Sequence, residues 1–280
     1  MSIVIFGGTG ELGRRAIAAL LLAGVDPSEI RAAGRNAERL AALRVLGVTA
    51  VHVELNSASD VASAIKSGDT VVLISGADEN RLEQHLRVVE AAKAAGAERI
   101  LYTSVVRADD ERFPLVSDHR STEIAVSESG VPFMILRNGW YIENYSRNVM
   151  AAAESGQFVS ATGEGRVAAA SRQDYADALA AVALDETMIN RTLSLTGDTD
   201  FSYPDLAIAM AKIAGTEIRH VAVSEDELRE RLTRDGFPGE VAAFIAANDA
   251  SIAWGFLERT GDDLTRLIGR PTADLVTALR

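Results

Sequence analysis

The sequence contains no cysteine and only six prolines among its 280 residues. Without cysteine it has no disulfide bond and no thiolate metal site, and a reducing compartment suits it. No apolar run approaches the roughly 20 residues of a membrane span, and the first residues lack the basic start of a secretory signal. We therefore expect a cytoplasmic protein that does not bind a membrane.

Basic residues are outnumbered, with 28 lysines and arginines against 40 aspartates and glutamates and a net charge of −12. No basic stripe could follow a phosphate backbone, so the composition argues against a nucleic-acid partner. The four histidines lack the His-x-x-x-His spacing of metal ligands, and no Gly-x-Ser-x-Gly nucleophile elbow is present. We expect no metal site.

What is present is an alternation of short apolar runs with amphipathic stretches through the first half. Strands that are apolar on both faces and separated by helices predict a parallel sheet covered on both sides. The fold class is therefore α/β, a Rossmann-type doubly wound parallel sheet. The expected strands are Ser2–Phe6, Ile30–Ala33, Thr49–Val53, Thr70–Ile74, Arg99–Thr103 and Pro132–Leu136, and the helices are Arg14–Ala23, Ala37–Leu46, Ala58–Ser67 and Leu82–Ala95, the last ending at Gly96.

This rhythm loosens after about Asn148, and helix signals dominate from Tyr203 onward. We predict an NADP-binding domain over 1–150, completed by parts of 168–197, and a smaller, mostly helical substrate-binding lobe over 151–280. Ser224 followed by Glu227 is typical of a helix start. The other expected elements are strands at Gln157–Ala161, Leu193–Leu195 and Ile218–Ala222 and a helix at Gln173–Asp185.

A glycine-rich turn directly follows the first strand and opens the first helix. Its glycines have the spacing of a dinucleotide fingerprint with one extra residue, which allows a tight turn and a close backbone approach to a pyrophosphate. The helix N-terminus adds free N–H groups for the phosphates. The alternative is a turn with only a structural role. The candidate cofactor-binding residues here are Gly7, Thr9, Gly10, Glu11, Leu12 and Gly13.

Arg35 follows the second strand, where NAD-preferring sites place an acidic residue for the ribose 2′-hydroxyl. A guanidinium suits a 2′-phosphate instead, so we predict NADPH (NADP) as the cofactor. The alternative is an exposed arginine that only leads into a helix.

The ends of the next strands should line the same crevice, because ligands bind at the carboxyl ends of parallel strands. Leu55 is a candidate for the adenine pocket, and Ser75 and Gly76 for the ribose and pyrophosphate. Thr103 and Ser104 are expected near the nicotinamide. For each of them a plain loop role is the alternative.

The Tyr-x-x-x-Lys pair of typical short-chain dehydrogenases is missing. The only lysines are Lys66, Lys93 and Lys212, and none lies four residues after a tyrosine. The expected position of the pair reads Asp-His-Arg-Ser-Thr-Glu, residues 118–123.

With these features and the Arg-Asn-Gly-Trp-Tyr-Ile-Glu-Asn-Tyr run at 137–145, the chain resembles atypical short-chain dehydrogenases of the NmrA-like group. It looks most like the type 2 NAD(P)H:quinone oxidoreductases and the triphenylmethane reductases. His119 with Glu123, the Gly163–Gly165 turn before Asp174 and Tyr175, and Ile268–Thr272 also fit. The resemblance is weakest at about residues 198–265.

The resemblance implies direct hydride transfer from NADPH to a flat, electron-poor, quinone-like small molecule, without flavin. It makes Tyr141 and Asn144 the candidates for the substrate pocket, with Asn144 donating to the acceptor oxygen. It also implies that His119 hydrogen-bonds the substrate or orders water. Structural roles for Tyr141 and His119 stay open, as does a homodimer. The charged loop at 109–114 is expected near the substrate entrance.

The competing hypothesis is a non-catalytic NmrA-like sensor that binds NADP(H) and acts through a protein partner. The aromatic–asparagine run favours an enzyme, because a sensor needs no substrate pocket. Imine or dye reduction, or an isomerase with bound cofactor, are further readings.

Overall fold

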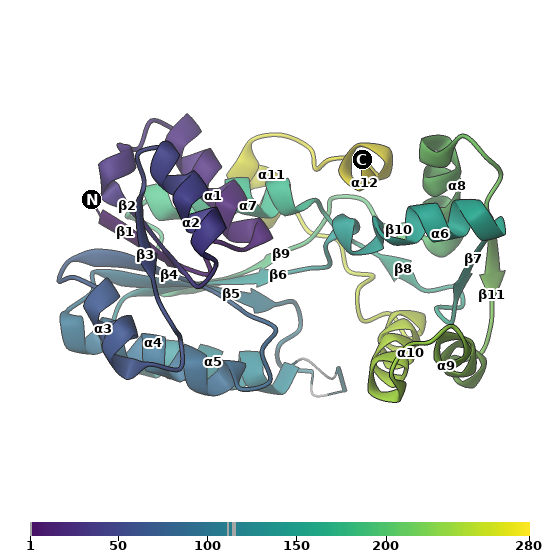
Figure 1. Cartoon of the computed structure of the whole chain (residues 1–280), viewed down its shortest axis with the longest axis horizontal. Coiled ribbons are helices and arrows are strands. Elements are labelled where there is room, and N and C mark those ends of the chain that lie inside the picture. Colours follow the sequence, from purple (N-terminus) through teal and green to yellow (C-terminus); the bar gives the residue numbers. More distant parts are fainter. Residues whose placement is uncertain (1, 111, 114–115) are drawn as a thin grey trace. The chain divides into compact units, whose positions relative to one another are not determined.

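A computed structural model describes residues 2–110, 112–113 and 116–280. Its main sheet has seven parallel strands in the order β3-β2-β1-β4-β5-β6-β9 (Figure 1). The order in which the strands are added to the sheet reverses between β1 and β4. In doubly wound folds the ligand-binding crevice lies at this point. The predicted fold class is confirmed. The strands are β1 (Ser2–Phe6), β2 (Ile30–Gly34), β3 (Thr49–His52), β4 (Asp69–Ile74), β5 (Arg99–Val105), β6 (Phe133–Asn138) and β9 (Arg191–Leu195).

Helices cover both faces of this sheet. In Figure 1, α1, α2 and α7 lie on one face, and α3, α4 and α5 on the other. The central strands are therefore buried on both sides, and Ile3, Val4 and Ile5 in β1 are fully buried in succession. The helices are α1 (Glu11–Leu22), α2 (Ala37–Val45), α3 (Ala58–Ala64), α4 (Arg81–Ala95), α5 (Val116–Glu128) and α7 (Arg172–Leu184), with a 3-10 turn η1 (Pro27–Glu29) before β2.

The chain divides into two compact units. The first consists of residues 1–109, 117–138 and 172–195, and the second of 110–116, 139–171 and 196–280. Helices predominate in the second unit, together with two small sheets, β7 with β11 and β8 with β10. Its elements are η2 (Ile142–Tyr145), α6 (Asn148–Ser155), β7 (Gln157–Ser160), β8 (Arg166–Val167), β10 (Phe201–Ser202), α8 (Tyr203–Ala214), β11 (Arg219–Ala222), α9 (Glu225–Arg234), α10 (Gly239–Ala253), α11 (Asp263–Ile268) and α12 (Leu275–Leu279).

Local signals set several helix ends. Gly96 ends α4 in the left-handed conformation, and the Ser224 hydroxyl accepts from the Glu227 N–H at the start of α9, both as predicted. At α8, Ser202 and Asp205 form a full capping box. Among the described residues, no helix is long and apolar enough to cross a membrane.

Candidate cofactor and substrate site

The glycine turn between β1 and α1 has room only for glycine at two of its positions. Gly7 has φ +83°, a conformation that side chains disfavour. A Cβ on Gly13 would lie 2.3 Å from the Gly7 carbonyl oxygen and 2.8 Å from the Gly8 Cα. The close approach is thus between the first turn of α1 and the backbone of the loop.

The start of α1 is suited to hold a phosphate group. Gly10 is its N-cap residue and contributes no side-chain cap, while its own N–H donates to the Gly7 carbonyl at 2.9 Å. The first N–H groups of a helix have no partner within the helix, and they carry the positive end of its dipole. The compact loop and the uncapped helix start therefore fit a dinucleotide pyrophosphate.

Arg35 lies directly after β2 and half of its side chain is exposed. Its guanidinium makes an ion pair of 3.2 Å with Asp78, whose side chain is 38% exposed. A pair this exposed contributes little to stability, so the guanidinium can exchange Asp78 for a stronger phosphate contact at small cost.

The loop after β3 carries Leu55, which packs partly buried against the main core. The Arg87 guanidinium of α4 donates to the Leu55 carbonyl oxygen at 2.5 Å. The backbone of this predicted adenine contact is thus held in place by a side chain of α4.

Ser75 and Thr103 lie together at the ends of β4 and β5. The Ser75 N–H donates to the Thr103 hydroxyl at 3.0 Å, and Thr103 is 2% exposed. Ser104 is also buried, and its hydroxyl has no hydrogen-bond partner in the part of the chain that the structure describes. Gly76 follows on the loop, with open space where a Cβ would stand. A buried hydroxyl without a partner marks a place where a polar ligand atom would be stabilised.

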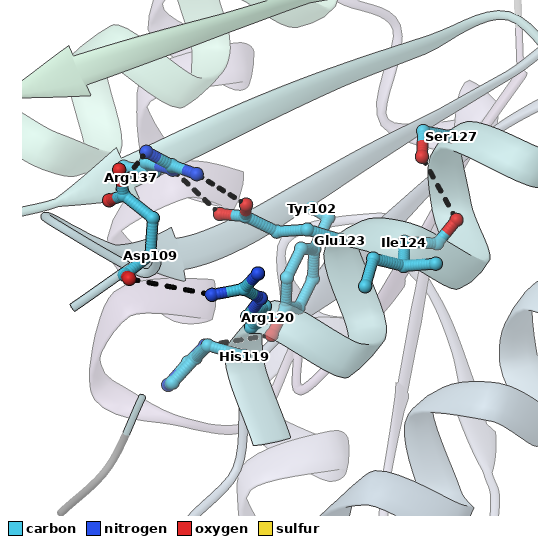
Figure 2. Close-up of polar contacts among 8 residues, drawn as sticks. All are labelled: Tyr102, Asp109, His119, Arg120, Glu123, Ile124, Ser127 and Arg137. Carbon is cyan, nitrogen blue, oxygen red and sulfur yellow. Dashed lines mark hydrogen bonds and ion pairs between the residues drawn. The ribbon is translucent and has the colours of Figure 1, made fainter. Parts of the chain in front are cut away.

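His119 lies near the start of α5 and is 7% exposed. Figure 2 shows its ring against the hydroxyl of Tyr102 from β5, with a distance of 2.7 Å from that oxygen to Nδ1. Burial, with smaller contributions from the positive Arg81 and from His85, lowers the pKa of His119 to about 3. The imidazole is therefore neutral at physiological pH.

Glu123 follows His119 by one helical turn and makes a different contact. Its carboxylate accepts two hydrogen bonds from Arg137 of β6, at 2.9 and 2.7 Å, and Arg137 also reaches Asp109 at 3.5 Å (Figure 2). Arg120 donates to the Asp109 carbonyl at 3.4 Å. These contacts fasten the start of the charged loop at 109–114, of which Glu111 and Pro114 lie outside the described residues.

Tyr141 and Asn144 belong to the second unit. Tyr141 is the N-cap residue of η2 and pairs with Ala170, while the Asn144 N–H donates to the Tyr141 carbonyl at 3.0 Å. Tyr141 is half-buried and Asn144 is exposed. The candidate site residues from Gly7 to His119 therefore lie in the first unit, and Tyr141 and Asn144 lie in the second.

Comparisons with known proteins show what the chain is related to. A family described as NAD(P)H-binding matches residues 7–186. The chain belongs to this NAD(P)H-binding family. Quinone oxidoreductase 2 of Escherichia coli K12 is 34% identical over 278 residues, covering 99% of this chain and 97% of that protein. The NAD(P)H azoreductase of Xenophilus azovorans is 25% identical, with 96% and 93% covered.

Solved structures agree with this placement. The E. coli NADPH-dependent quinone oxidoreductase complexed with NADPH is similar with a TM-score of 0.94 and 34% identity, covering 99% of this chain and 98% of that one. The Citrobacter sp. triphenylmethane reductase complexed with NADP(H) has a TM-score of 0.93 and 32% identity, with 99% of each chain covered. The resemblance inferred from the sequence is confirmed.

One candidate cofactor-binding residue, Arg39, was not singled out from the sequence. Arg39 lies on α2, one turn after Arg35, and donates to the Thr9 carbonyl of the glycine loop at 3.0 Å. It also lies 3.7 Å from the Glu11 carboxylate. Its place in the first turn of the helix that directly follows Arg35 was the signal that could have found it. No metal-binding cluster occurs among the residues described here.

The segment that carries Asn144 is anchored by a buried polar cluster of the second unit. The Tyr145 and Tyr203 hydroxyls lie 3.0 Å apart, and Asp249 of α10 accepts from Tyr203 and, at 2.9 Å, from the Ala161 N–H. Burial raises the pKa of Asp249 to about 6, although both hydrogen bonds act to lower it. The folded protein thus binds the Asp249 proton more tightly than the unfolded chain does.

This shift predicts a pH-dependent stability. The contribution of Asp249 is fully present below pH 4 and is lost as the pH rises through about 6, a change on the order of 3 kcal/mol. The Asp249→Asn variant does not titrate there. Chemical denaturation at a series of pH values should therefore show wild type losing stability relative to the variant between pH 4 and 7.

The exposed Asp226, changed to Asn, is the matched control, with its side chain 79% exposed on α9. A constant difference between wild type and Asp249→Asn across this range would contradict the prediction.

Proposed function

We propose that the protein is an NADPH-dependent reductase that transfers hydride directly to a quinone-like, electron-poor acceptor, without flavin. The observation that carries the proposal is the full-length relationship to E. coli quinone oxidoreductase 2, at 34% identity and a TM-score of 0.94. The glycine turn and the Arg35 position at the β2 end support the same cofactor.

The chemistry suits a site without Tyr-x-x-x-Lys. Bound NADPH supplies the hydride. An acceptor quinone that gains hydride becomes an aromatic hydroquinone anion, and one proton from water completes the hydroquinone. Because the aromatic anion spreads its charge, the protein needs to position the acceptor and stabilise one oxygen rather than supply a strong acid.

Each of the proposed cofactor-binding residues is assigned to one part of the NADPH molecule. The pyrophosphate is held by the glycine turn and the first N–H groups of α1, and the 2′-phosphate by Arg35 together with Arg39. Leu55 contacts the adenine. Ser75, Gly76, Thr103 and Ser104 line the path toward the nicotinamide.

The residues proposed for the acceptor are Tyr141, Asn144 and His119. Tyr141 packs against the flat ring. Asn144 donates its amide N–H to the acceptor oxygen, and the neutral His119 hydrogen-bonds the substrate or orders the water that delivers the proton. A cytoplasmic setting is proposed with this function, in agreement with the absence of cysteine.

The first test is oxidation of NADPH and of NADH by the purified protein with four acceptors. These are a benzoquinone, a naphthoquinone, a triphenylmethane dye and an azo dye, each assayed with and without added flavin. Turnover of a quinone that prefers NADPH and does not need flavin is expected. Tight NADPH binding with no turnover of any acceptor would overturn the proposal in favour of the redox sensor.

Asn144→Ala tests the acceptor site. Loss of one hydrogen bond to an oxygen that gains charge costs roughly 1.5–3 kcal/mol, or about 10- to 150-fold in kcat. NADPH affinity should stay nearly unchanged, since Asn144 is not among the proposed cofactor contacts. Steady-state kinetics and an NADPH titration measure the two quantities, and the neighbouring exposed Asn148→Ala is the control. Unchanged turnover of Asn144→Ala would remove Asn144 from the site.

A further inference from the structure

A row of polar side chains is buried between β5 and the helices α4 and α5. It consists of His85, Tyr102, His119 and Thr122, whose exposures are 1%, 0%, 7% and 0%. The His85 and Tyr102 rings meet edge to face with centroids 5.5 Å apart, and Tyr102 and His119 lie 6.0 Å apart. Buried groups of this kind must satisfy one another, so the hydrogen bonds decide where each proton lies.

The order of donors can be followed from the backbone carbonyl of Asp118, which can only accept. The Thr122 hydroxyl has a single proton, and its shorter contact, 2.7 Å, is to this carbonyl. Thr122 therefore accepts from His85, whose Nδ1 lies 3.0 Å away and carries the proton. His85 Nε2 is then the nitrogen without a proton, and it is buried without a hydrogen-bond partner among the described residues.

His119 receives the opposite assignment. Tyr102 is fully buried, and its burial raises the pKa of the phenol, so the hydroxyl keeps its proton. The His119 Nδ1 lies 2.7 Å from that hydroxyl. If the phenol donates there, Nδ1 is the acceptor, and the single proton of the neutral ring is on Nε2.

Burial is the main reason that this ring stays neutral, and its neighbours add to the effect. Arg81 of α4 and the buried His85 both disfavour a second proton on His119, and Asp118, which accepts from Arg81 at 2.8 Å, favours one only weakly. The balance lowers the pKa of His119 to about 3, so the ring stays neutral well below physiological pH.

We propose that Tyr102 is a positioning residue that fixes His119 in the Nε2–H tautomer, so that His119 offers a neutral N–H donor to the acceptor oxygen. This rests on the proposed function for the identity of the acceptor and for its position beside His119. A neutral imidazole can polarise a carbonyl without donating its proton fully. His119 then contributes a pH-independent hydrogen bond, and the proton that completes the product comes from water.

The test is a long-range ¹H–¹⁵N spectrum of the histidines in the full chain, without substrate, in which protonated and bare ring nitrogens separate clearly. In wild type we expect His119 protonated at Nε2 and His85 at Nδ1. His119→Gln assigns the signals. A His119 protonated at Nδ1 would overturn the proposal, because Tyr102 would then be its acceptor.

The Thr122 hydroxyl is a second possible partner of the Tyr102 phenol, and two variants separate it from His119. Tyr102→Phe removes the donor, and the His119 nitrogens should shift toward a mixture of tautomers. Thr122→Val should alter His85 and leave the His119 tautomer unchanged. A changed His119 tautomer in Thr122→Val would show that Tyr102 donates to Thr122 instead, and would overturn the proposal. The wild-type spectrum decides the tautomer even if a variant fails to fold.

Kinetics then connect the tautomer to the reaction. Tyr102→Phe should lower kcat for a quinone by roughly fivefold, which is one hydrogen bond of about 1 kcal/mol, with an unchanged KM for NADPH. An Nε2–H tautomer in a protein that reduces no quinone would contradict the proposed function and leave the assignment intact. An unchanged kcat in an active Tyr102→Phe variant with mixed tautomers would overturn the positioning role.

Discussion

Gly13→Ala is expected to weaken NADPH binding by about 5- to 150-fold, which corresponds to a steric cost of roughly 1–3 kcal/mol. The new Cβ would stand 2.3 Å from the Gly7 carbonyl oxygen and 2.8 Å from the Gly8 Cα. Both are backbone atoms, so the loop itself must move away from the helix start. Alanine favours a helix over glycine by at most about 1 kcal/mol, which does not offset that movement.

A titration of NADPH against protein fluorescence measures this affinity. Gly239→Ala is the matched control, since a Cβ there meets nothing within 4 Å and the residue also lies in the first turn of a helix, α10. Thermal unfolding of Gly13→Ala shows whether the fold persists. A folded variant with wild-type NADPH affinity would mean that the compact turn does not hold the cofactor.

Arg35→Ala should lower NADPH affinity by roughly 10- to 150-fold while NADH affinity changes little, since a hydrogen bond to a charged group contributes about 1.5–3 kcal/mol. NADH has no 2′-phosphate and makes no use of the guanidinium. The loss of the pair with Asp78 should have little effect, because both side chains are substantially exposed. The preference between the cofactors should therefore nearly disappear.

Parallel titrations of NADPH and NADH test this, with Arg44→Ala as the control. Arg44 is an exposed arginine of the same helix region, and it donates to the Ala50 carbonyl of β3. Equal weakening of both cofactors by Arg35→Ala would remove Arg35 from the 2′-phosphate site. Arg39→Ala should show the same selectivity to a smaller degree, because Arg39 already donates to the Thr9 carbonyl.

The sheet was predictable because its strands are buried on both faces. Strands such as β1 and β4 are then nearly continuous apolar runs, and Gly96 marks the end of α4 by its chemistry alone. The glycine turn was also predictable, because the strand before it and the helix after it could be recognised in the sequence.

Helix α5 was not among the predicted elements, and the reason is physical. The buried face of α5 includes the polar residues His119, Thr122 and Glu123, so the usual apolar stripe is interrupted. Two-residue strands such as β8 and β10 are too short to have a periodicity.

The partners within the site were hidden for another reason. Tyr102 and His119 lie 17 residues apart, Glu123 and Arg137 lie 14 apart, and Ala161 and Asp249 lie 88 apart. Nothing in the local sequence pairs them, because the contact is made by the packing of different elements. His119 and Glu123 could be singled out from the sequence, but their partners could not.

The interleaving of the two units has a consequence for synthesis on the ribosome. Six of the seven strands of the main sheet lie before residue 139, but α7, which packs beside α1, and β9 come only after residues 139–171 of the other unit. At about 5–20 residues per second, a nascent chain therefore waits several seconds with the part of that face under α7 uncovered. The buried Tyr175, Leu179 and Val182 of α7 then cover it. Translation speed through this stretch should thus govern how much of the chain needs a chaperone.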